Sequence, residues 1–306
     1  MRATLLLALV PLALLAPVAA AEPLPVDVEL YVLNVGNYDT VKGAYTVDFY
    51  LTFSWDAAAA GNVTPLRYEF MNGRATSTDR ISDETDEAGV RSVTWRIQAN
   101  LYSEPRFTKY PYDTQRLEVL FEDVVHGSDA LVYRPVAETS GLDENVRIAG
   151  WRVKDVSFTE TTKEYPPDES FSRGRFTVLV EREPLSSTIK SFLPPVAFCL
   201  VAGLGFFFHP SKVANRITLG TGMLISAVAF HISQTQSLPP LGELITFDKV
   251  MLCVYAFIVG CLVVSTLIHI DEDYWKDRDH TRQINVMGFG ATVALTGLLF
   301  LLLFLL

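Results

Sequence analysis

The turn at residues 106–123, RFTKYPYDTQRLEVLFED, brings two aromatic rings, a proline and a carboxylate together. Pro111 fixes its own φ angle, and the rings of Tyr110 and Tyr112 can rest on a neighbouring surface. A buried Asp113 carboxylate would need a cation beside it, because an unpaired buried charge is costly. The turn therefore predicts charge pairing rather than catalysis, either as an ordinary structural salt bridge or as a contact between two parts of the molecule.

The histidines give little support to catalytic or metal chemistry. Only His126 lies in residues 22–189, whereas the others lie in or beside long apolar stretches: His209, His231, His269 and His280. His126 alone cannot supply a Ser-His-Asp set or a His-rich metal site. The sequence also has no H-E-x-x-H motif and no phosphate-binding glycine loop. We therefore expect no enzyme and no cofactor, and we assign no residue to a metal.

Apolar stretches define a membrane domain. Residues 1–21 contain Arg2, an apolar run and small residues ending at Ala21, which is typical of a cleaved secretory signal. Beyond Lys190, four stretches nearly free of charge are each close to the roughly 20 residues that cross a bilayer. These predicted spans are 190–208, 213–236, 247–269 and 284–306. Four successive spans indicate an integral membrane protein with residues 190–306 as its transmembrane domain.

The exported segment, residues 22–189, is acidic and has no cysteine. It contains 17 Lys plus Arg and 28 Asp plus Glu, a difference of −11. This balance disfavours nucleic acid and favours cationic partners. Because Cys199, Cys253 and Cys261 all lie in the predicted spans, no disulfide can stabilise the exported segment.

Alternation of polar and apolar residues predicts that the exported segment is built from β-strands. The clearest alternation covers residues 45–55, YTVDFYLTFSW. Shorter ones occur at 26–35, 91–101, 115–124, 151–159 and 174–183, separated by turn-forming clusters at 61–65, 82–89, 126–129 and 166–174. We expect an all-β, immunoglobulin-like sandwich over residues 22–189, joined almost without a linker to an all-α bundle of four spans.

Charge in the connections predicts the orientation. An exported sandwich and four spans place the C-terminus on the periplasmic or extracellular side of the cell (inner) membrane. The connections at 209–212 and 270–283 are then cytoplasmic, and they contain Lys212, Lys276, Arg278 and Arg282. The outer connection at 237–249 has only Lys249. This asymmetry agrees with the positive-inside rule.

The second span carries more polar side chains than a lipid-facing helix should. Its helical spacing places five residues on one stripe, which begins with a hydroxyl and ends apolar: Thr218, Gly222, Ile225, Ala229 and Ile232. In a monomer the stripe would be a buried helix face. Around a symmetry axis it would line a pore whose apolar constriction can close by dewetting.

Taken together, these features resemble the pentameric ligand-gated ion channels of the Cys-loop receptor superfamily. The resemblance rests on the sandwich, the turn YPYDTQ, the segment FLPP at 192–195 and the four spans. In animal receptors two cysteines bridge this turn, and the matching positions here are Ser103 and Leu117. The resemblance therefore implies a prokaryotic-type homopentamer that lacks the disulfide and contacts membrane lipids.

The resemblance also implies residues that couple the sandwich to the pore. Arg182 matches the family's arginine before the membrane, and Asp39 lies in the matching turn between the first two strands. With Asp113, these residues would form a cluster above the outer turn SLPPLGELITF at 237–247, which includes Pro239.

A ligand site between subunits follows from the amine-gated bacterial relatives. Glu122 matches the carboxylate of an aromatic box, and the matching rings are Phe158, Phe171, Tyr31 and Tyr50. Val124 stands where the box usually has another aromatic residue. A small cationic or amine ligand would fit ring faces and a carboxylate. The acidic capping loop leaves a divalent cation or protons as alternative triggers, and its residues are Glu160, Glu164, Tyr165, Asp168 and Glu169.

Ion selectivity is expected to favour monovalent cations. The acidic ring that cation-selective relatives usually carry at the cytoplasmic mouth is replaced by Ala214 and Asn215, followed by Arg216. The excess of carboxylates outside the membrane, with Glu243 near the outer mouth, would concentrate cations. The sequence thus predicts a ligand-gated cation channel that opens at the apolar part of the second span. The alternatives are a pH-gated channel of the same family and a membrane-anchored sensor that does not conduct.

Overall fold

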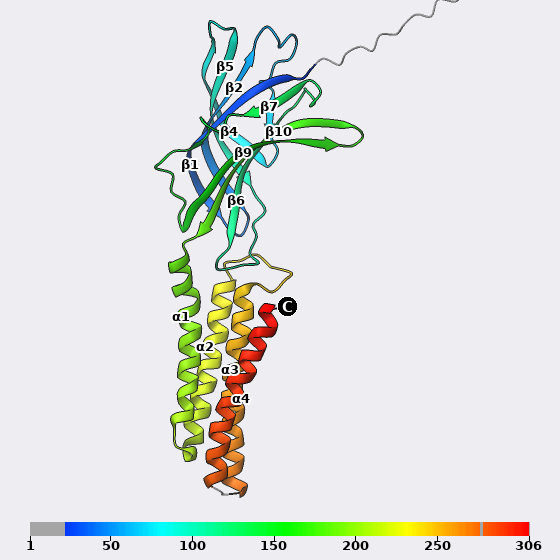
Figure 1. The fold of residues 1–306 in the computed structure, drawn as a ribbon. Coiled ribbons are helices and arrows are strands. Elements are labelled where there is room, and N and C mark those ends of the chain that lie inside the picture. Colours follow the sequence, from blue (N-terminus) through cyan, green and yellow to red (C-terminus); the bar gives the residue numbers. More distant parts are fainter. Residues whose placement is uncertain (1–21, 276–277, 306) are drawn as a thin grey trace, which may run out of the picture.

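A β domain stands at one end of a bundle of four long helices (Figure 1). The computed structural model describes residues 22–275 and 278–305. The strands are β1 (Leu24–Asp39), β2 (Ala44–Asp56), β3 (Tyr68–Phe70), β4 (Gly73–Thr85), β5 (Val90–Tyr102), β6 (Thr114–Asp123), β7 (Leu131–Pro135), β8 (Gly141–Leu142), β9 (Trp151–Tyr165) and β10 (Glu169–Arg182). This order confirms the predicted all-β domain followed by an all-α domain.

Two sheets form the sandwich. The first has the strand order β4-β5-β2-β1-β7, with β8 pairing with β1, and the second has the order β3-β6-β10-β9. The long pairs are antiparallel, whereas β7 and β8 run parallel to β1. Because side chains alternate along a strand, each sheet turns one apolar face toward the other.

Aromatic side chains fill the space between the sheets. Phe49 and Phe53 of β2 are fully buried, as are Phe121 of β6 and Phe176 of β10. The rings of Phe53 and Phe121 meet edge to face, with their centroids 6.0 Å apart. Each buried Phe stabilises the fold by about 1.5–3 kcal/mol. β6 and β10 are hydrogen-bonded neighbours in the second sheet, and both contribute rings to this core.

One long strand was not predicted. β4, GRATSTDRISDET, is an edge strand whose residues are exposed on both faces, so it has no apolar alternation to detect. The turn expected at 82–89 consequently begins later, because β4 continues to Thr85. The turn expected at 166–174 is also shorter, since β10 begins at Glu169.

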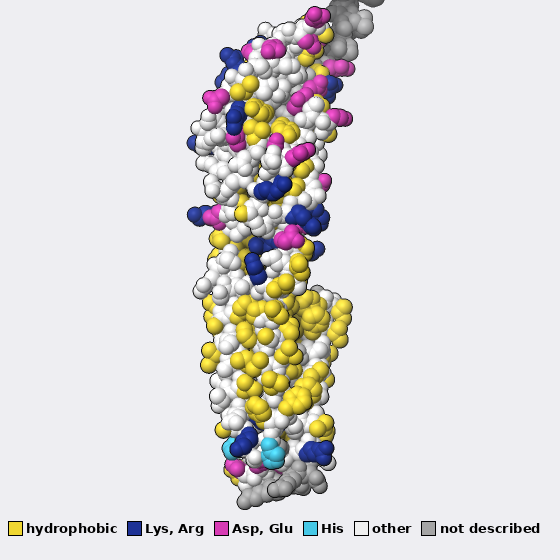
Figure 2. All heavy atoms as spheres, turned by 90° about the vertical axis from the view of Figure 1, so that its left-hand side faces the viewer, with side chains coloured by type: hydrophobic (Ala, Val, Ile, Leu, Met, Phe, Trp, Pro, Cys, Tyr) yellow, Lys and Arg dark blue, Asp and Glu magenta, His cyan; other side chains and the backbone are white. Residues whose placement is uncertain are grey.

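Four helices are long and apolar enough to cross a membrane. They are α1 (Pro184–Gly203), α2 (Val213–Thr235), α3 (Thr246–Ile270) and α4 (Arg278–Leu305), and short turns follow α1 at Leu204–Phe207, precede α2 at Pro210–Lys212 and extend α3 at Asp271–Trp275. Figure 2 shows apolar side chains as a broad band over this part, with charged side chains gathered on the sandwich and at the far end of the bundle.

Helix ends differ from the predicted spans where polar residues are helical. α1 begins at Pro184 rather than at 190, because proline suits the first turn of a helix. α4 begins at Arg278 rather than at 284, since its first turn is polar and gives no hydropathy signal. The predicted signal segment, residues 1–21, lies outside the described residues.

The bundle places α2 against α1 and α3, and α4 against α3 (Figure 1). A Cβ atom at Gly220 would lie 2.6 Å from the side chain of Leu262, so glycine permits the close approach of α2 to α3. The C-terminal end of α4 lies at the end of the bundle that faces the sandwich (Figure 1). The Lys249 ammonium stands 5.7 Å from the Phe304 ring centroid at that end.

Candidate functional site

The turn that precedes β6 joins the sandwich to the membrane domain. Tyr110 is buried in an apolar cluster with Leu238, Ile245 and Phe247, and its ring meets that of Phe247 edge to face at 6.1 Å. The Tyr110 hydroxyl donates a hydrogen bond to Oε1 of Gln234 in α2, 3.3 Å away. The turn thus contacts the second helix directly, a contact that sequence reasoning did not foresee.

Neighbouring residues of the turn fasten it to the other helices. The Tyr112 ring stacks on Phe192 of α1, and its hydroxyl lies 2.8 Å from the Thr188 hydroxyl. Thr108 donates to Glu243 at 2.9 Å and accepts a hydrogen bond from the backbone N–H of Thr246 at 3.2 Å. The predicted contact of this turn with residues 237–247 is therefore present.

Asp113 has the cationic partner that its burial requires. The carboxylate is 1 % exposed, and Nε of Arg182 donates to Oδ1 at 2.6 Å. Its other oxygen accepts from Gln115 at 2.7 Å. The Arg182 guanidinium also lies over the rings of Tyr110 and Trp151, 5.1 and 4.5 Å from their centroids. Charge and ring faces together fix the end of β10, from which α1 begins.

Asp39 does not join this pair. Its Oδ1 accepts from the backbone N–H groups of Val41 and Lys42, so the carboxylate caps its own turn. The ring of Tyr38 reaches the cluster instead, 5.6 Å from that of Trp151. Burial, followed by the negative charge of Asp113, raises the pKa of Tyr38 above its usual range. Pro239 lies in the connection between α2 and α3, after the buried Leu238.

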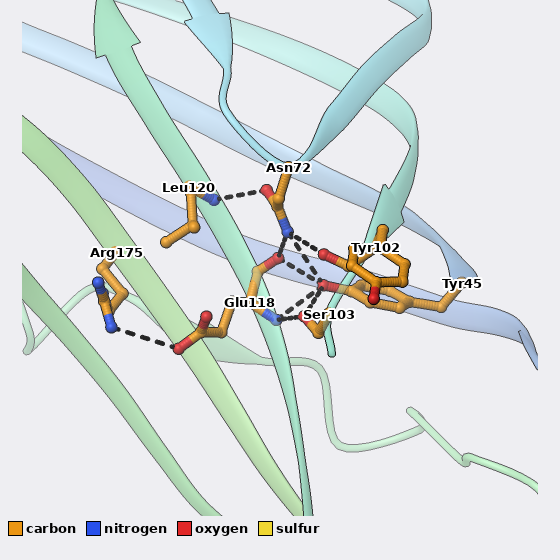
Figure 3. A network of polar contacts seen from close by, with 7 residues as sticks. All are labelled: Tyr45, Asn72, Tyr102, Ser103, Glu118, Leu120 and Arg175. Atoms are coloured by element: carbon orange, nitrogen blue, oxygen red, sulfur yellow. Dashed lines mark hydrogen bonds and ion pairs between the residues drawn. The ribbon is translucent and has the colours of Figure 1, made fainter. Parts of the chain in front are cut away.

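A hydrogen-bond network closes the base of the turn (Figure 3). The Tyr45 hydroxyl donates to the Glu118 carbonyl oxygen at 2.5 Å, accepts from the Glu118 N–H at 2.7 Å and lies 2.9 Å from the Ser103 hydroxyl. Asn72 adds bonds to the carbonyl oxygens of Tyr102 and Glu118. Burial raises the pKa of Tyr45 to about 12. Ser103, at a position predicted to match a bridging cysteine, thus holds the turn without a disulfide.

Glu122, the predicted ligand carboxylate, already has a cationic partner. Its side chain is 5 % exposed, and it accepts a hydrogen bond from Nε of Arg173 at 2.5 Å and from the Tyr165 hydroxyl at 3.1 Å. The Tyr165 hydroxyl also accepts from Arg173 at 2.8 Å. Burial and then the negative charge of Glu122 raise the pKa of Tyr165. Arg173 was missed, although the register places it directly opposite Glu122, and Tyr165 was predicted only as a member of the capping loop.

The predicted aromatic residues do not all lie beside Glu122. The Phe171 ring lies 6.0 Å from that of Tyr165, on the same outer face. Phe158 instead packs against Phe121 and Phe176, facing the core between the sheets. Its expected place in an aromatic box is therefore not observed, because strand alternation turns it away from that face.

Tyr31 and Tyr50 lie on the other sheet. They are register partners on β1 and β2, and their buried neighbours Leu30, Phe49 and Leu51 face the core, so both tyrosines face outward. Within one chain they are on a different face from Glu122. They could meet it only across a boundary between subunits. Among the described residues, no group of three or more His, Cys, Asp or Glu side chains could share a metal ion.

The predicted stripe of α2 is left uncovered by the rest of the chain. Thr218, Ala229, Ile225 and Ile232 are exposed, the last two at 65 % and 52 %, and a Cβ at Gly222 would meet nothing within 4 Å. Arg216 points elsewhere and is 3 % exposed. Its guanidinium donates to Oδ1 of Asn285 in α4 and to the Phe208 carbonyl oxygen. Its charge is thus kept away from the stripe.

Comparison with known proteins identifies channels as relatives. No protein-family model matches the chain. It is 25 % identical over 276 residues to the proton-gated ion channel of Gloeobacter violaceus, covering 83 % of this chain and 75 % of that one. It is 22 % identical over 281 residues to the acetylcholine receptor subunit alpha-1-B of Xenopus laevis, covering 84 % of this chain and 61 % of the subunit. It is also similar to the pH-sensitive chloride channel 2 of Drosophila melanogaster, with 24 % identity over 211 residues, which make up 64 % of this chain and 40 % of that channel.

The chain therefore spans less than two thirds of the length of the two animal relatives. The similarity to the bacterial and acetylcholine relatives runs through both the sandwich and the helices, since it covers more than four fifths of this chain. These relatives are channels and not enzymes, and the four apolar helices make the chain a multi-pass membrane protein. The chain is therefore similar to ion channels of the Cys-loop receptor type, from a bacterium and from animals.

Proposed function

We propose that the protein forms a homopentamer in which the α2 helices of the subunits surround an ion pore. The observation that carries this proposal is the uncovered stripe of α2, whose exposed residues change from Thr218 to Ile225 and Ile232 along the helix. In a closed ring the stripe would be buried toward the axis. The isoleucines would form an apolar constriction that closes by dewetting.

Opening would begin at the outer face of β6 and β10. A ligand that binds the open arrangement more tightly shifts the equilibrium toward it. β6 joins Glu122 at one end to the turn with Asp113 at the other, and this turn contacts both Gln234 and the connection between α2 and α3. Movement of the strand would therefore be passed to α2 and would change the pore radius at Ile225 and Ile232.

For the ligand site, we propose that Glu122 and Phe171 face Tyr31 and Tyr50 of the neighbouring subunit. A small cationic or amine ligand would have to replace Arg173 at the Glu122 carboxylate. Protons are the second candidate trigger. They are favoured because one relative is a proton-gated ion channel.

We propose that the pore selects monovalent cations. Residues 22–189 contain 28 acidic and 17 basic side chains, so the entrance would attract cations. The buried Arg216 offers no positive charge to the stripe. A chloride channel among the relatives makes selectivity the property that most needs measurement.

The orientation we propose places the sandwich and the C-terminus on the periplasmic or extracellular side of the cell (inner) membrane. Basic residues at the far end of the bundle, Lys212 and Arg278, would then face the cytoplasm. Residues 22–189 would form the ligand-binding domain and residues 190–306 the transmembrane domain.

Voltage-clamp recording tests the proposal. Protein in membranes is exposed to pH steps and to primary amines, and reversal potentials are measured with asymmetric NaCl. We expect evoked currents that reverse near the sodium equilibrium potential. Reversal near the chloride potential would contradict the proposed selectivity, and the lack of any evoked current would support a non-conducting sensor instead.

Substitution of Ile225 tests the position of the gate. Ile225→Ala should lower the half-activating stimulus about tenfold, or open the pore spontaneously. The smaller alanine side chain leaves a wider and less apolar constriction, which is easier to hydrate. A tenfold change is equivalent to ~1.4 kcal/mol. Leu224→Ala is the control in the same helix, because Leu224 packs against the apolar cluster of the bundle rather than on the uncovered stripe. Equal effects of the two substitutions would argue against a gate at Ile225.

A further inference from the structure

Three polar side chains cross-link the outer half of α2 to α3. Nε2 of His231 lies 2.9 Å from Oδ1 of Asp248, and Nδ1 lies 2.9 Å from the Tyr255 hydroxyl. The imidazole also meets the Phe247 ring edge to face at 5.6 Å. His231 comes directly before Ile232 of the stripe. Ionisable groups inside membrane spans are costly and commonly functional, so this group requires an explanation.

The Asp248 carboxylate connects this contact to the sandwich. Its second oxygen, Oδ2, accepts a hydrogen bond from the N–H of Ile245 at 3.1 Å, at the residue that caps the N-terminus of α3. The next residue, Thr246, donates its backbone N–H to the Thr108 carbonyl oxygen. Hydrogen bonds, joined by the backbone between Ile245 and Thr246, thus connect the turn before β6, through the start of α3, to α2. His231 is the last residue of this connection.

The same geometry fits two protonation states of the imidazole. Neutral His231 can donate from Nε2 to the carboxylate while Nδ1 accepts the Tyr255 O–H. After protonation both nitrogens donate, so the Tyr255 hydroxyl must turn to accept, and the hydrogen bond between a neutral imidazole and the Asp248 carboxylate becomes an ion pair. Imidazole changes charge between about pH 5 and 8, a range in which ordinary carboxyl and phenol groups do not.

The surroundings contain few competing charges. From α3, Asp248 and Tyr255 face the ring, and the neighbouring Lys249 points toward Phe304 of α4. On α2 itself, Gln234 is neutral and accepts from Tyr110. From α1, Phe198 packs on Phe230, the residue before His231. Among these described neighbours, Asp248 is the carboxylate within hydrogen-bonding distance of the imidazole.

We propose that the His231–Asp248 contact is a proton-operated latch, which holds the outer half of α2 on α3 and sets the pH range in which the pore responds. His231 acts as a positioning residue, since it places the helix that carries the stripe. The inference rests on the proposed channel function, which it deepens by naming a group through which pH acts. Proton uptake tightens the latch, and proton loss weakens it.

The test compares pH–response curves of the full-length channel for three variants. His231→Gln keeps a hydrogen-bond donor but cannot take up a proton, so the dependence of the current on pH between about 5 and 8 should be lost. Asp248→Asn keeps the shape but removes the charge that stabilises the imidazolium, so the midpoint should move about one pH unit lower. His209→Gln is the matched control and should leave the midpoint unchanged, because among the described residues the His209 ring bonds to Ser211 in its own turn. A wild-type curve for His231→Gln, or a midpoint that moves higher for Asp248→Asn, would overturn the proposal.

A second measurement does not depend on conductance. Thermal unfolding of the purified protein is recorded for wild type, His231→Gln, Asp248→Asn and the double variant at about pH 5.5 and 8.5, on either side of the imidazole range. The latch predicts that the two substitutions are non-additive in their effect on the unfolding temperature, and more so at the lower pH. Equal coupling at both pH values would refute it. If no current is evoked but the two substitutions are still non-additive in a pH-dependent way, the channel function is refuted and the latch is not. The two failures can therefore be told apart.

Discussion

The paired strands β6 and β10 carry an ion pair at each end, and the two pairs differ in what surrounds them. At the membrane end, Asp113 binds Arg182; at the outer end, Glu122 binds Arg173. Both carboxylates are almost completely buried, at 1 % and 5 % side-chain exposure. The chemistry is the same, but the elements that the two pairs hold together are not.

The membrane-end pair lies among rigid groups. Gln115 binds the second oxygen of Asp113, and the rings of Tyr110 and Trp151 cover Arg182. Arg182 also ends the strand that leads directly into α1. We therefore interpret the Asp113–Arg182 pair as a fixed joint, that is, a contact between the sandwich and α1 that persists when the channel opens.

The outer pair depends on a projecting hairpin. Tyr165, which binds both Glu122 and Arg173, lies at the end of β9, and the hairpin of β9 and β10 extends away from the sandwich (Figure 1). Most residues of β9 are exposed. The hairpin is bound to the sandwich by this pair, by the Tyr165 hydroxyl and by hydrogen bonds of Ser170 and Ser172, and its exposed end can move when the pair is disturbed. The comparison suggests that the outer pair is the movable contact and the inner pair the fixed one.

The largest effect is expected from breaking the fixed pair. Arg182→Gln should destabilise the protein by about 3–5 kcal/mol, because it leaves the Asp113 charge buried without a partner. Thermal unfolding and the yield of assembled oligomer would measure this loss. Arg134→Gln is the control, since Arg134 and Asp27 form an exposed pair that should contribute at most ~1 kcal/mol. If both substitutions have equally small effects, the inner pair is not a joint.

A smaller effect on stability, with a larger one on sensitivity, is expected at the outer pair. Glu122→Gln removes the charge opposite Arg173 and should cost about 1–3 kcal/mol of stability, while strongly raising the stimulus needed for opening. The double variant Glu122→Gln with Arg173→Gln should recover stability, because neither charge remains, but not sensitivity. Current recordings and thermal unfolding on the same preparations separate the two effects. Recovery of both would show that the pair is only structural.

The sequence was sufficient for the parts of the fold that depend on periodicity and on composition. Alternation in β2 revealed the buried Phe49 and Phe53, and the apolar stretches revealed four helices. The polar strand β4 left no such signal, since neither of its faces is buried. At the site, the expected burial of Asp113 predicted a cationic partner, the resemblance to a known family indicated Arg182, and the pair is present.

Other site residues depended on strand register, which a single sequence does not define. Phe158 lies opposite Phe176 and shares its inward direction, whereas Phe171 lies opposite Lys163 and faces outward. Arg173 became visible as the partner of Glu122 only when the register was known. For Asp39 the prediction of a distant partner was wrong for a local reason. Its carboxylate accepts hydrogen bonds from the backbone of its own turn and does not pair with Arg182.

The smallest expected effect tests how the fixed joint reaches the pore helix. Tyr110→Phe keeps the ring against Phe247 and below Arg182, but removes the hydroxyl that donates to Gln234. A hydrogen bond of this kind contributes about 0.5–1.5 kcal/mol, so the half-activating stimulus should change by less than about tenfold, with assembly unaffected. Tyr112→Phe provides the comparison, because its hydroxyl meets Thr188 of α1 and not α2. A shift for Tyr110→Phe alone would assign coupling to α2, whereas equal shifts would spread it over both helices.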